Sequence, residues 1–90
     1  MAKFAAILTF GNEEQRLATR PRHREYLRSL LDQGRLVGSG PWADDTGALI
    51  IYEAADEAEA MALIENDPYH EGDILAGLEL KQWNRNLPEP

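Results

Sequence analysis

Hydrophobic residues along this chain fall into blocks with two kinds of spacing, and each kind predicts a different secondary structure. Residues 3–10 are almost continuously apolar, which favours a strand, and Gly11 followed by Asn12 is typical of its end. Three further short blocks predict strands over residues 35–40, 48–54 and 73–83, with a turn over 42–47. In the last block one face is expected to carry Ile74, Ala76, Leu78 and Leu80.

A block with helical spacing follows the first strand. From Pro21 to Gln33, apolar residues three and four positions apart share one face, namely Leu27, Leu30 and Leu31. We expect Thr19 or a neighbouring residue to cap this helix, and Gly34 to end it.

A second helix is expected from Asp56 to about Asn66. Asp56 followed by Glu59 resembles a capping box, the usual arrangement of side-chain and backbone hydrogen bonds at a helix start. Asp67 precedes Pro68, and a residue before proline avoids the helical region of backbone conformation. The helix is therefore expected to end before Asp67.

The predicted order of elements is β-α-β-β-α-β. Two β-α-β halves joined by a hairpin are most simply arranged as an antiparallel sheet with both helices on one face, the ferredoxin-like α+β fold. Ninety residues suffice for one such unit, so we expect a single domain over residues 1–90 with a loose tail over 86–90.

The sheet face that the helices leave open is also predicted to be apolar. The first strand carries Phe4, Ala6, Leu8 and Phe10 on one side against Ala5 and Ile7 on the other, and the third strand carries Leu49 and Ile51 against Ala48, Ile50 and Tyr52. In a monomer the open face of such a sheet is normally polar. We therefore expect a homodimer that packs through this face, which would enlarge the core of a 10.1 kDa chain.

Charge and composition argue against several classes of function. Sixteen acidic residues against nine basic ones give a net charge of −7, which disfavours general binding to nucleic acid or anionic membranes. Cysteine is absent, which excludes disulfides, thiolate chemistry and cysteine-based zinc sites. No apolar run reaches the roughly 18 residues of a membrane span. The start of the chain resembles a strand and not a secretion signal, so we expect a cytoplasmic protein.

The topology is expected to bring four distant segments to one end of the domain. The loops after the first and second strands meet there with the start of the first helix and the end of the second. The segments concerned are Phe10-Gly11, the helix start around His23, Ser39-Gly40-Pro41 and Asp67-Pro68-Tyr69.

Among these residues, His23 and Asp67 are candidates for acid/base chemistry. His23 shares the apolar face of its helix with Leu27 and Leu30, so its imidazole is expected to point toward the sheet. Asp67 would point inward too if the second helix persisted that far. A carboxylate beside an imidazole fixes its tautomer and stabilises its charged form, as general acid/base catalysis requires.

Structural roles remain open for both residues. A histidine on an apolar helix face is often a packed core residue, and Asp before Pro often only ends a helix. A metal site made of His23, Asp67 and His70 is conceivable, but no ligand spacing supports it. The chain has no glycine-rich phosphate loop and no dinucleotide fingerprint, so we expect neither a metal nor a cofactor.

Positive charge is concentrated around the first helix. Six of the nine basic residues are Arg16, Arg20, Arg22, Arg24, Arg28 and Arg35. Helix N-termini also attract anions, so we expect a site for a small carboxylate or phenolate with Arg20 or Arg22 as its anchor. A solvated helix face, balanced by nearby acidic residues, is the alternative. Ser39 could donate a hydrogen bond to the ligand, but no nucleophile elbow surrounds it, which disfavours a serine hydrolase.

An ordered set of residues resembles the YciI-like (YCII-related) family. The set is Arg20-x-x-His23-x-x-Tyr26-Leu27, Gly34, Ser39-Gly40-Pro41, Gly47, Asp67-Pro68-Tyr69 and Gly72. The resemblance spans the chain from about residue 3 to Trp83. It implies a ferredoxin-like fold that dimerises into an α+β barrel, the architecture shared with muconolactone isomerases and small cofactor-free monooxygenases. It also implies an active-site His and Asp, matching His23 and Asp67, and one branch of the family eliminates chloride from a chlorinated hydroxyhydroquinone.

Pattern and resemblance together favour a small cofactor-independent enzyme of the lyase or isomerase kind, acting on a compact anionic or phenolic molecule. His23 would move a proton and Asp67 would orient and stabilise it. The substrate-binding residues are predicted to be Arg20, Ser39, Pro41 and Tyr69. The alternative is a binding or accessory protein that holds a small metabolite in the same pocket without chemistry.

Overall fold

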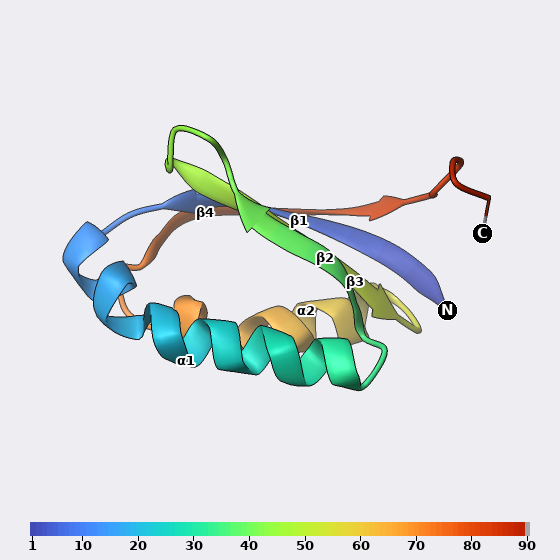
Figure 1. Cartoon of the computed structure of the whole chain (residues 1–90), viewed down its shortest axis with the longest axis horizontal. Helices are drawn as coiled ribbons and strands as arrows, with labels where there is room; N and C mark the ends of the chain where they lie inside the picture. Colours follow the sequence, from blue (N-terminus) through green and yellow to red (C-terminus); the bar gives the residue numbers. More distant parts are fainter. Residues whose placement is uncertain (90) are drawn as a thin grey trace.

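The computed structural model describes residues 1–89 and has the predicted order of elements (Figure 1). The elements are β1 (Ala2–Phe10), α1 (Glu13–Asp32), β2 (Leu36–Pro41), β3 (Gly47–Ala54), α2 (Glu57–Glu65), the single 3-10 turn η1 (Pro68–His70) and β4 (Leu75–Trp83). The four strands form one antiparallel sheet in the order β2-β3-β1-β4. Both helices lie on the same face of this sheet, which confirms the ferredoxin-like α+β fold (Figure 1).

The core lies between the sheet and the helices. Phe4, Ala6 and Leu8 of β1 are buried, and their register partners on β3, which are Tyr52, Ile50 and Ala48, are buried beside them. The helices contribute Leu27, Leu30, Leu63 and Ile64 to the same core. Alternation along the strands thus directs one set of side chains to the helices and the other set to the open face.

Helix α1 begins two turns earlier than the sequence pattern predicts. Asn12, and not Thr19, is the N-cap, and its side chain accepts a hydrogen bond of 2.8 Å from the backbone N–H of Gln15. Pro21 lies inside the helix and is exposed, so it does not mark the helix start. The expected apolar face is also corrected, because Leu31 is 53% exposed.

Both helices end where predicted. Gly34 adopts a φ of 75°, a conformation that costs glycine little, and its backbone N–H donates to the carbonyl of Leu31. Helix α2 starts after the N-cap Asp56, whose side chain accepts from the backbone N–H of Glu59, and its C-cap is Asn66.

Strand β4 is shorter than predicted and contains an irregularity. It starts at Leu75, and its register against β1 shifts between Thr9 and Phe10. As a result Leu75 pairs with Phe10, whereas Leu78 pairs with Leu8. Ala76 has no register partner on β1, so it does not share one face with Leu78 and Leu80 as predicted.

The chain after β4 contains no helix or strand up to residue 89, and the last residue of the predicted loose tail, Pro90, lies outside the described residues. Within residues 1–89, no helix has the length and apolarity needed to cross a membrane.

Candidate functional site

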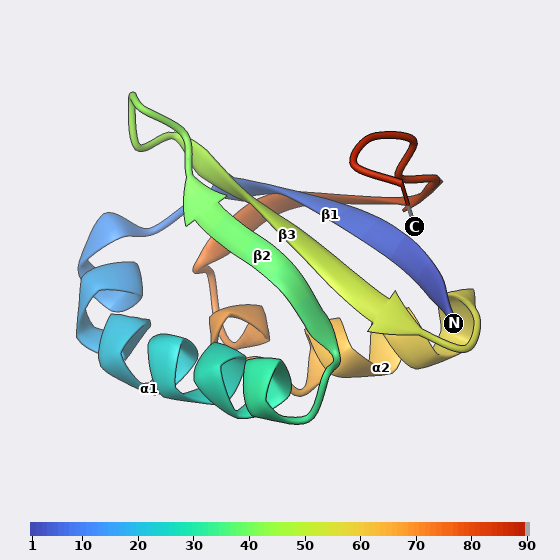
Figure 2. The same cartoon turned by 45° about the vertical axis from the view of Figure 1, so that its right-hand side comes forward.

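A cavity of about 180 Å³ opens between the sheet and the N-terminal half of α1. Its wall is formed by β1, α1, β2, the β2–β3 hairpin and η1, through Phe10, Arg16, Arg20, His23, Arg24, Leu27, Ser39, Gly40, Pro41, Asp45, Ala48, Ile50 and Tyr69. Figure 2 shows the hairpin and the start of α1 at the same end of the molecule. A cavity of roughly 150 Å³ can hold benzene, so this one matches a single-ring molecule.

His23, which is part of this wall, forms a buried pair with Asp67, which lies behind it. The Nδ1 atom of His23 lies 2.7 Å from Oδ1 and 2.9 Å from Oδ2 of Asp67. Their side chains are only 10% and 4% exposed. An ionised carboxylate accepts hydrogen bonds only, so beside an ionised Asp67 the tautomer with the proton on Nδ1 is favoured, which leaves Nε2 without a hydrogen-bond partner among the described residues.

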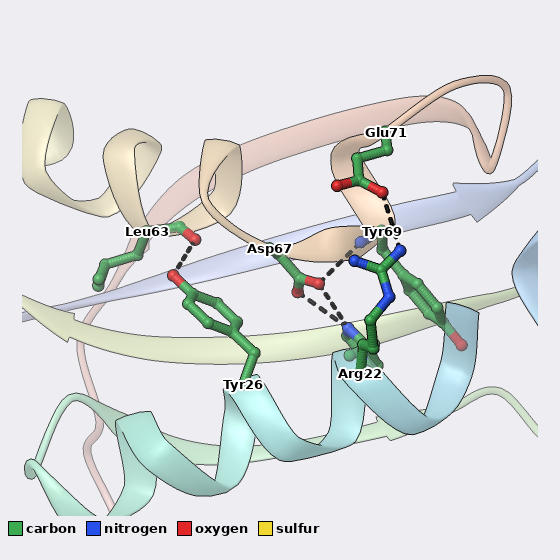
Figure 3. A network of polar contacts seen from close by, with 7 residues as sticks. Arg22, Tyr26, Leu63, Asp67, Tyr69 and Glu71 are labelled. Carbon is green, nitrogen blue, oxygen red and sulfur yellow. Dashed lines mark hydrogen bonds and ion pairs between the residues drawn. The ribbon is translucent and has the colours of Figure 1, made fainter.

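Asp67 is held in place by the backbone as well as by the imidazole. It is the N-cap of η1, and its Oδ1 accepts a hydrogen bond of 2.9 Å from the backbone N–H of Tyr69. Figure 3 shows Asp67 between this turn and α1. The inward direction of Asp67 was predicted, but it comes from the turn and not from a continuation of α2.

The ring of Tyr69 packs flat against the imidazole of His23. The two ring centroids are 3.6 Å apart and the planes differ by 1°. Phe10 contacts Tyr69 in a T-shaped arrangement, with ring centroids 5.9 Å apart and planes at 85°. Burial raises the pKa of the Tyr69 phenol, and the charges of Arg16 and Arg20 oppose that rise. These contacts fix the plane of the His23 ring.

Three of the five arginines of α1 border the cavity. Arg16, Arg20 and Arg24 line the cavity, whereas Arg22 points to Glu71 in an exposed ion pair of 3.1 Å (Figure 3). Of the two predicted anchors, only Arg20 therefore borders the cavity. Because α1 starts at Glu13, Arg20 and His23 lie within the helix, so the helix N-terminus is not beside them as expected, and the anion site stays a prediction that depends on the arginine side chains.

The structure places most of the predicted site residues together. Arg20, Ser39, Pro41 and Tyr69 line the cavity with His23, while Asp67 lies behind the imidazole. Their roles toward a ligand stay predictions. No group of three or more potential metal-ligating side chains occurs within residues 1–89, and His70 is exposed.

Sequence reasoning did not assign three charged residues of the cavity to the site, namely Arg16, Arg24 and Asp45. The Nη2 atom of Arg16 lies 3.1 Å from Oδ2 of Asp45. The spacing of Arg16 from Arg20 and His23, four and seven residues, could have shown that all three share a helix face. No pattern indicates Asp45, which reaches Arg16 only through the shape of the hairpin.

Comparisons with known proteins agree with the fold and the motif. The YCII-related domain matches residues 2–84. The chain is 34% identical over 67 residues to the derivative of benzaldehyde biosynthesis cluster protein C of Emericella nidulans, covering 62% of this chain and 68% of that protein. It is 30% identical over 82 residues to Protein YciI of Escherichia coli O6:H1, covering 80% and 84%.

Among solved structures, the fold is similar to that of the 5-chloro-2-hydroxyhydroquinone dehydrochlorinase of Burkholderia phenoliruptrix AC1100 in complex with 2,5-dihydroxybenzoquinone. The TM-score is 0.75 at 22% identity, covering 97% of this chain and 99% of that one. The match to the domain extends over nearly the whole sequence, and the predicted resemblance is confirmed. This chain therefore belongs to the YCII-related domain family.

Proposed function

We propose that this protein is a cofactor-independent enzyme of the lyase or isomerase kind that acts on a small anionic or phenolic ring. The observation that carries the proposal is the buried His23–Asp67 pair, whose second imidazole nitrogen is left free beside a cavity of single-ring size. A purely structural histidine would also need a partner for its buried N–H, but it would not need its second nitrogen beside a cavity.

The geometry supports a simple proton-transfer mechanism. Nε2 of His23 accepts a proton from a hydroxyl or an acidic C–H of the substrate, and Asp67 stabilises the imidazolium that forms. Arg20, three residues before His23 on α1, and Ser39 on β2 hold the substrate oxygens. His23 then returns the proton to another position in an isomerisation, or releases it to solvent after a leaving group has departed with its electron pair.

The structural relative suggests a concrete substrate class. Its name describes the removal of hydrogen chloride from a chlorinated hydroxyhydroquinone, and its structure holds a dihydroxybenzoquinone. Both are single rings with acidic oxygens, as the size and positive charge of the cavity here would favour.

Turnover by matched variants tests this proposal. We expect the wild type to convert 5-chloro-2-hydroxyhydroquinone or another member of a panel of hydroxylated aromatic acids and lactones, followed by chloride release and absorbance. His23→Ala and Asp67→Asn should each lower the rate by a factor of about 10² or more, the usual contribution of a positioned acid/base group. His70→Ala, which changes an exposed histidine, should leave the rate unchanged.

Other results would favour the alternatives. Full turnover by His23→Ala would remove the acid/base assignment. Tight binding of 2,5-dihydroxybenzoquinone with no conversion of any panel member would indicate a binding protein. Asp67→Asn that loses stability but keeps the wild-type rate would show that the pair is structural.

A further inference from the structure

Arg16 is buried to a degree that is unusual for a charged side chain. It is 5% exposed, and its Nε atom has no hydrogen-bond partner among the described residues. The guanidinium lies over the ring of Phe10, with Cζ 4.3 Å from the ring centroid. Burying a charged group is costly unless its hydrogen bonds are satisfied, so an incompletely paired guanidinium in a cavity wall is ready to accept an anion.

The one carboxylate that Arg16 contacts is easily released. Asp45 pairs with Arg16 through one oxygen, at 3.1 Å, and its side chain is 54% exposed. Asp45 belongs to the hairpin turn, where its φ is 61° and its backbone N–H donates to the carbonyl of Trp42. An exposed carboxylate regains its hydration when it leaves, so the net cost of breaking this pair is small.

Arg16 lies in the same cavity as His23, the residue proposed to transfer the proton. Arg16 and His23 border the same cavity, and seven residues of helix separate them by about 10.5 Å along the axis. Tyr69 connects the two, because its ring stacks on His23 and the charge of Arg16 acts on its phenol. A single ring with an acidic oxygen at one end and the reacting atom at the other would contact both groups.

We propose that Arg16 is a second anion-binding residue of the cavity, beside Arg20, and that the Asp45 carboxylate occupies it until a ligand's acidic oxygen takes its place. The ligand class is a single ring that carries a phenolate, enolate or carboxylate oxygen remote from the atom that faces His23. Which ligand atom faces His23 rests on the proposed function, whereas the displacement of Asp45 from Arg16 does not depend on it. Removing the Asp45 carboxylate should thus strengthen ligand binding.

Binding of 2,5-dihydroxybenzoquinone, followed by absorbance and calorimetry, tests the exchange. Asp45→Asn should bind this anion about tenfold more tightly than the wild type, because the internal competitor is gone. Asn also tolerates a positive φ, so the turn is preserved. Asp44→Asn removes the same charge one residue away, where the side chain contacts Thr46 and not Arg16, and should change the dissociation constant less than about twofold.

Changes at Arg16 provide the reciprocal test. Arg16→Gln should weaken binding at least about tenfold, and Arg16→Lys should lie between it and the wild type because a point charge replaces the planar fork. The Nε–H resonance of Arg16 should shift in a saturable way during the titration. Should Arg16→Gln fail to fold, the comparison of Asp45→Asn with Asp44→Asn still decides the question.

Three results would overturn the inference. They are equal affinities for Asp45→Asn and Asp44→Asn, wild-type affinity in a folded Arg16→Gln, and no saturable binding to either wild type or Asp45→Asn at millimolar probe. The same titrations in a His23→Ala background separate the two proposals. Tighter binding on loss of Asp45 in that background would keep the exchange at Arg16 whether or not the wild type is an enzyme, whereas a wild type that converts no member of the panel would reject the proposed enzyme alone.

Discussion

Asp67 has two structural tasks that involve the same oxygen atom. Oδ1 accepts from the backbone N–H of Tyr69 and from Nδ1 of His23, so the turn that presents Tyr69 also fixes the imidazole. Any change at Asp67 therefore acts on the backbone and on the candidate base together. This is why stability and turnover have to be measured side by side for Asp67→Asn.

The stacking of Tyr69 on His23 leads to a prediction at this scale. Tyr69→Ala would leave a cavity beside the imidazole and should lower the free energy of unfolding by about 3 kcal/mol or more. Tyr69→Phe keeps the ring and should cost less than about 1.5 kcal/mol. Urea unfolding of both variants checks this. Equal losses would mean that the hydroxyl and not the stacked ring stabilises the site.

Tyr52 predicts how stability depends on alkaline pH. Its side chain is 1% exposed, and burial raises its pKa above the ordinary value of about 10. Below that pH both the folded and unfolded states keep the phenol proton. Above it only the unfolded state loses the proton, so stability falls as pH rises from about 10.

Unfolding curves at a series of alkaline pH values measure this effect. The free energy of unfolding of the wild type should decrease more steeply than that of Tyr52→Phe, by up to about 1.4 kcal/mol per pH unit. Parallel pH profiles for the two proteins would show that the phenol of Tyr52 ionises as easily in the folded state as in the unfolded chain.

How far the site can be predicted from sequence differs from residue to residue. The inward direction of His23 follows from its helical spacing to Leu27 and Leu30, both of which are buried. Arg16 lies on the same face, but it falls in a polar stretch before Pro21 that has no apolar periodicity to reveal the helix. Its partner Asp45 could not be predicted, because the contact spans 29 residues and depends on a turn conformation.

At the scale of elements, the extra turns of α1 are what complete the cavity. Residues 13–20 bring Arg16 and Arg20 to the site, and Asn12 provides the cap that starts them. The helix continues through Pro21 but lacks one hydrogen bond there, because proline has no N–H to donate to the carbonyl of Leu17.

Replacing Pro21 should therefore stabilise the protein. Pro21 is exposed, so Pro21→Ala removes no buried contact, and we expect the free energy of unfolding to rise by up to about 3 kcal/mol. Arg22→Ala, also exposed in the same helix, should change it by less than about 0.5 kcal/mol. A Pro21→Ala variant no more stable than the wild type would show that the helix already accommodates the missing hydrogen bond.

Strand boundaries were predictable where a continuous apolar run ends at turn residues, as in β1 and β3. The irregularity of β4 was not, because a register shift is a property of two paired strands and not of one sequence segment. The conformation of the β2–β3 turn, which brings Asp45 to Arg16, could not be predicted for a similar reason.

At the scale of the whole molecule, the face of the sheet away from the helices carries apolar side chains that nothing in the chain covers among the described residues. Ala5 and Ile7 of β1 face Ile51 and Leu49 of β3 across the register, on the side away from the helices, and all four remain partly exposed. Figure 1 shows no helix over this side. We propose that a second copy of the chain covers it.

Sedimentation at micromolar concentration tests the proposed homodimer. We expect a mass about twice 10.1 kDa for the wild type and about 10.1 kDa for Ile51→Glu, which places a charge in the middle of the apolar face. Leu31→Glu changes an exposed leucine on α1 and should leave the dimer intact. A stable wild-type monomer would contradict the proposal.

The most direct test of the central claim is the position of the proton on the His23 ring, read from long-range ¹H–¹⁵N NMR at about pH 8, where free imidazole is neutral. The account predicts a proton on Nδ1 and a bare Nε2 that shifts when 2,5-dihydroxybenzoquinone is added, with the exposed His70 as internal reference. In Asp67→Asn the proton should move partly to Nε2. A proton on Nε2 in the wild type, or an Nε2 resonance that the ligand leaves unchanged, would contradict a base facing the cavity.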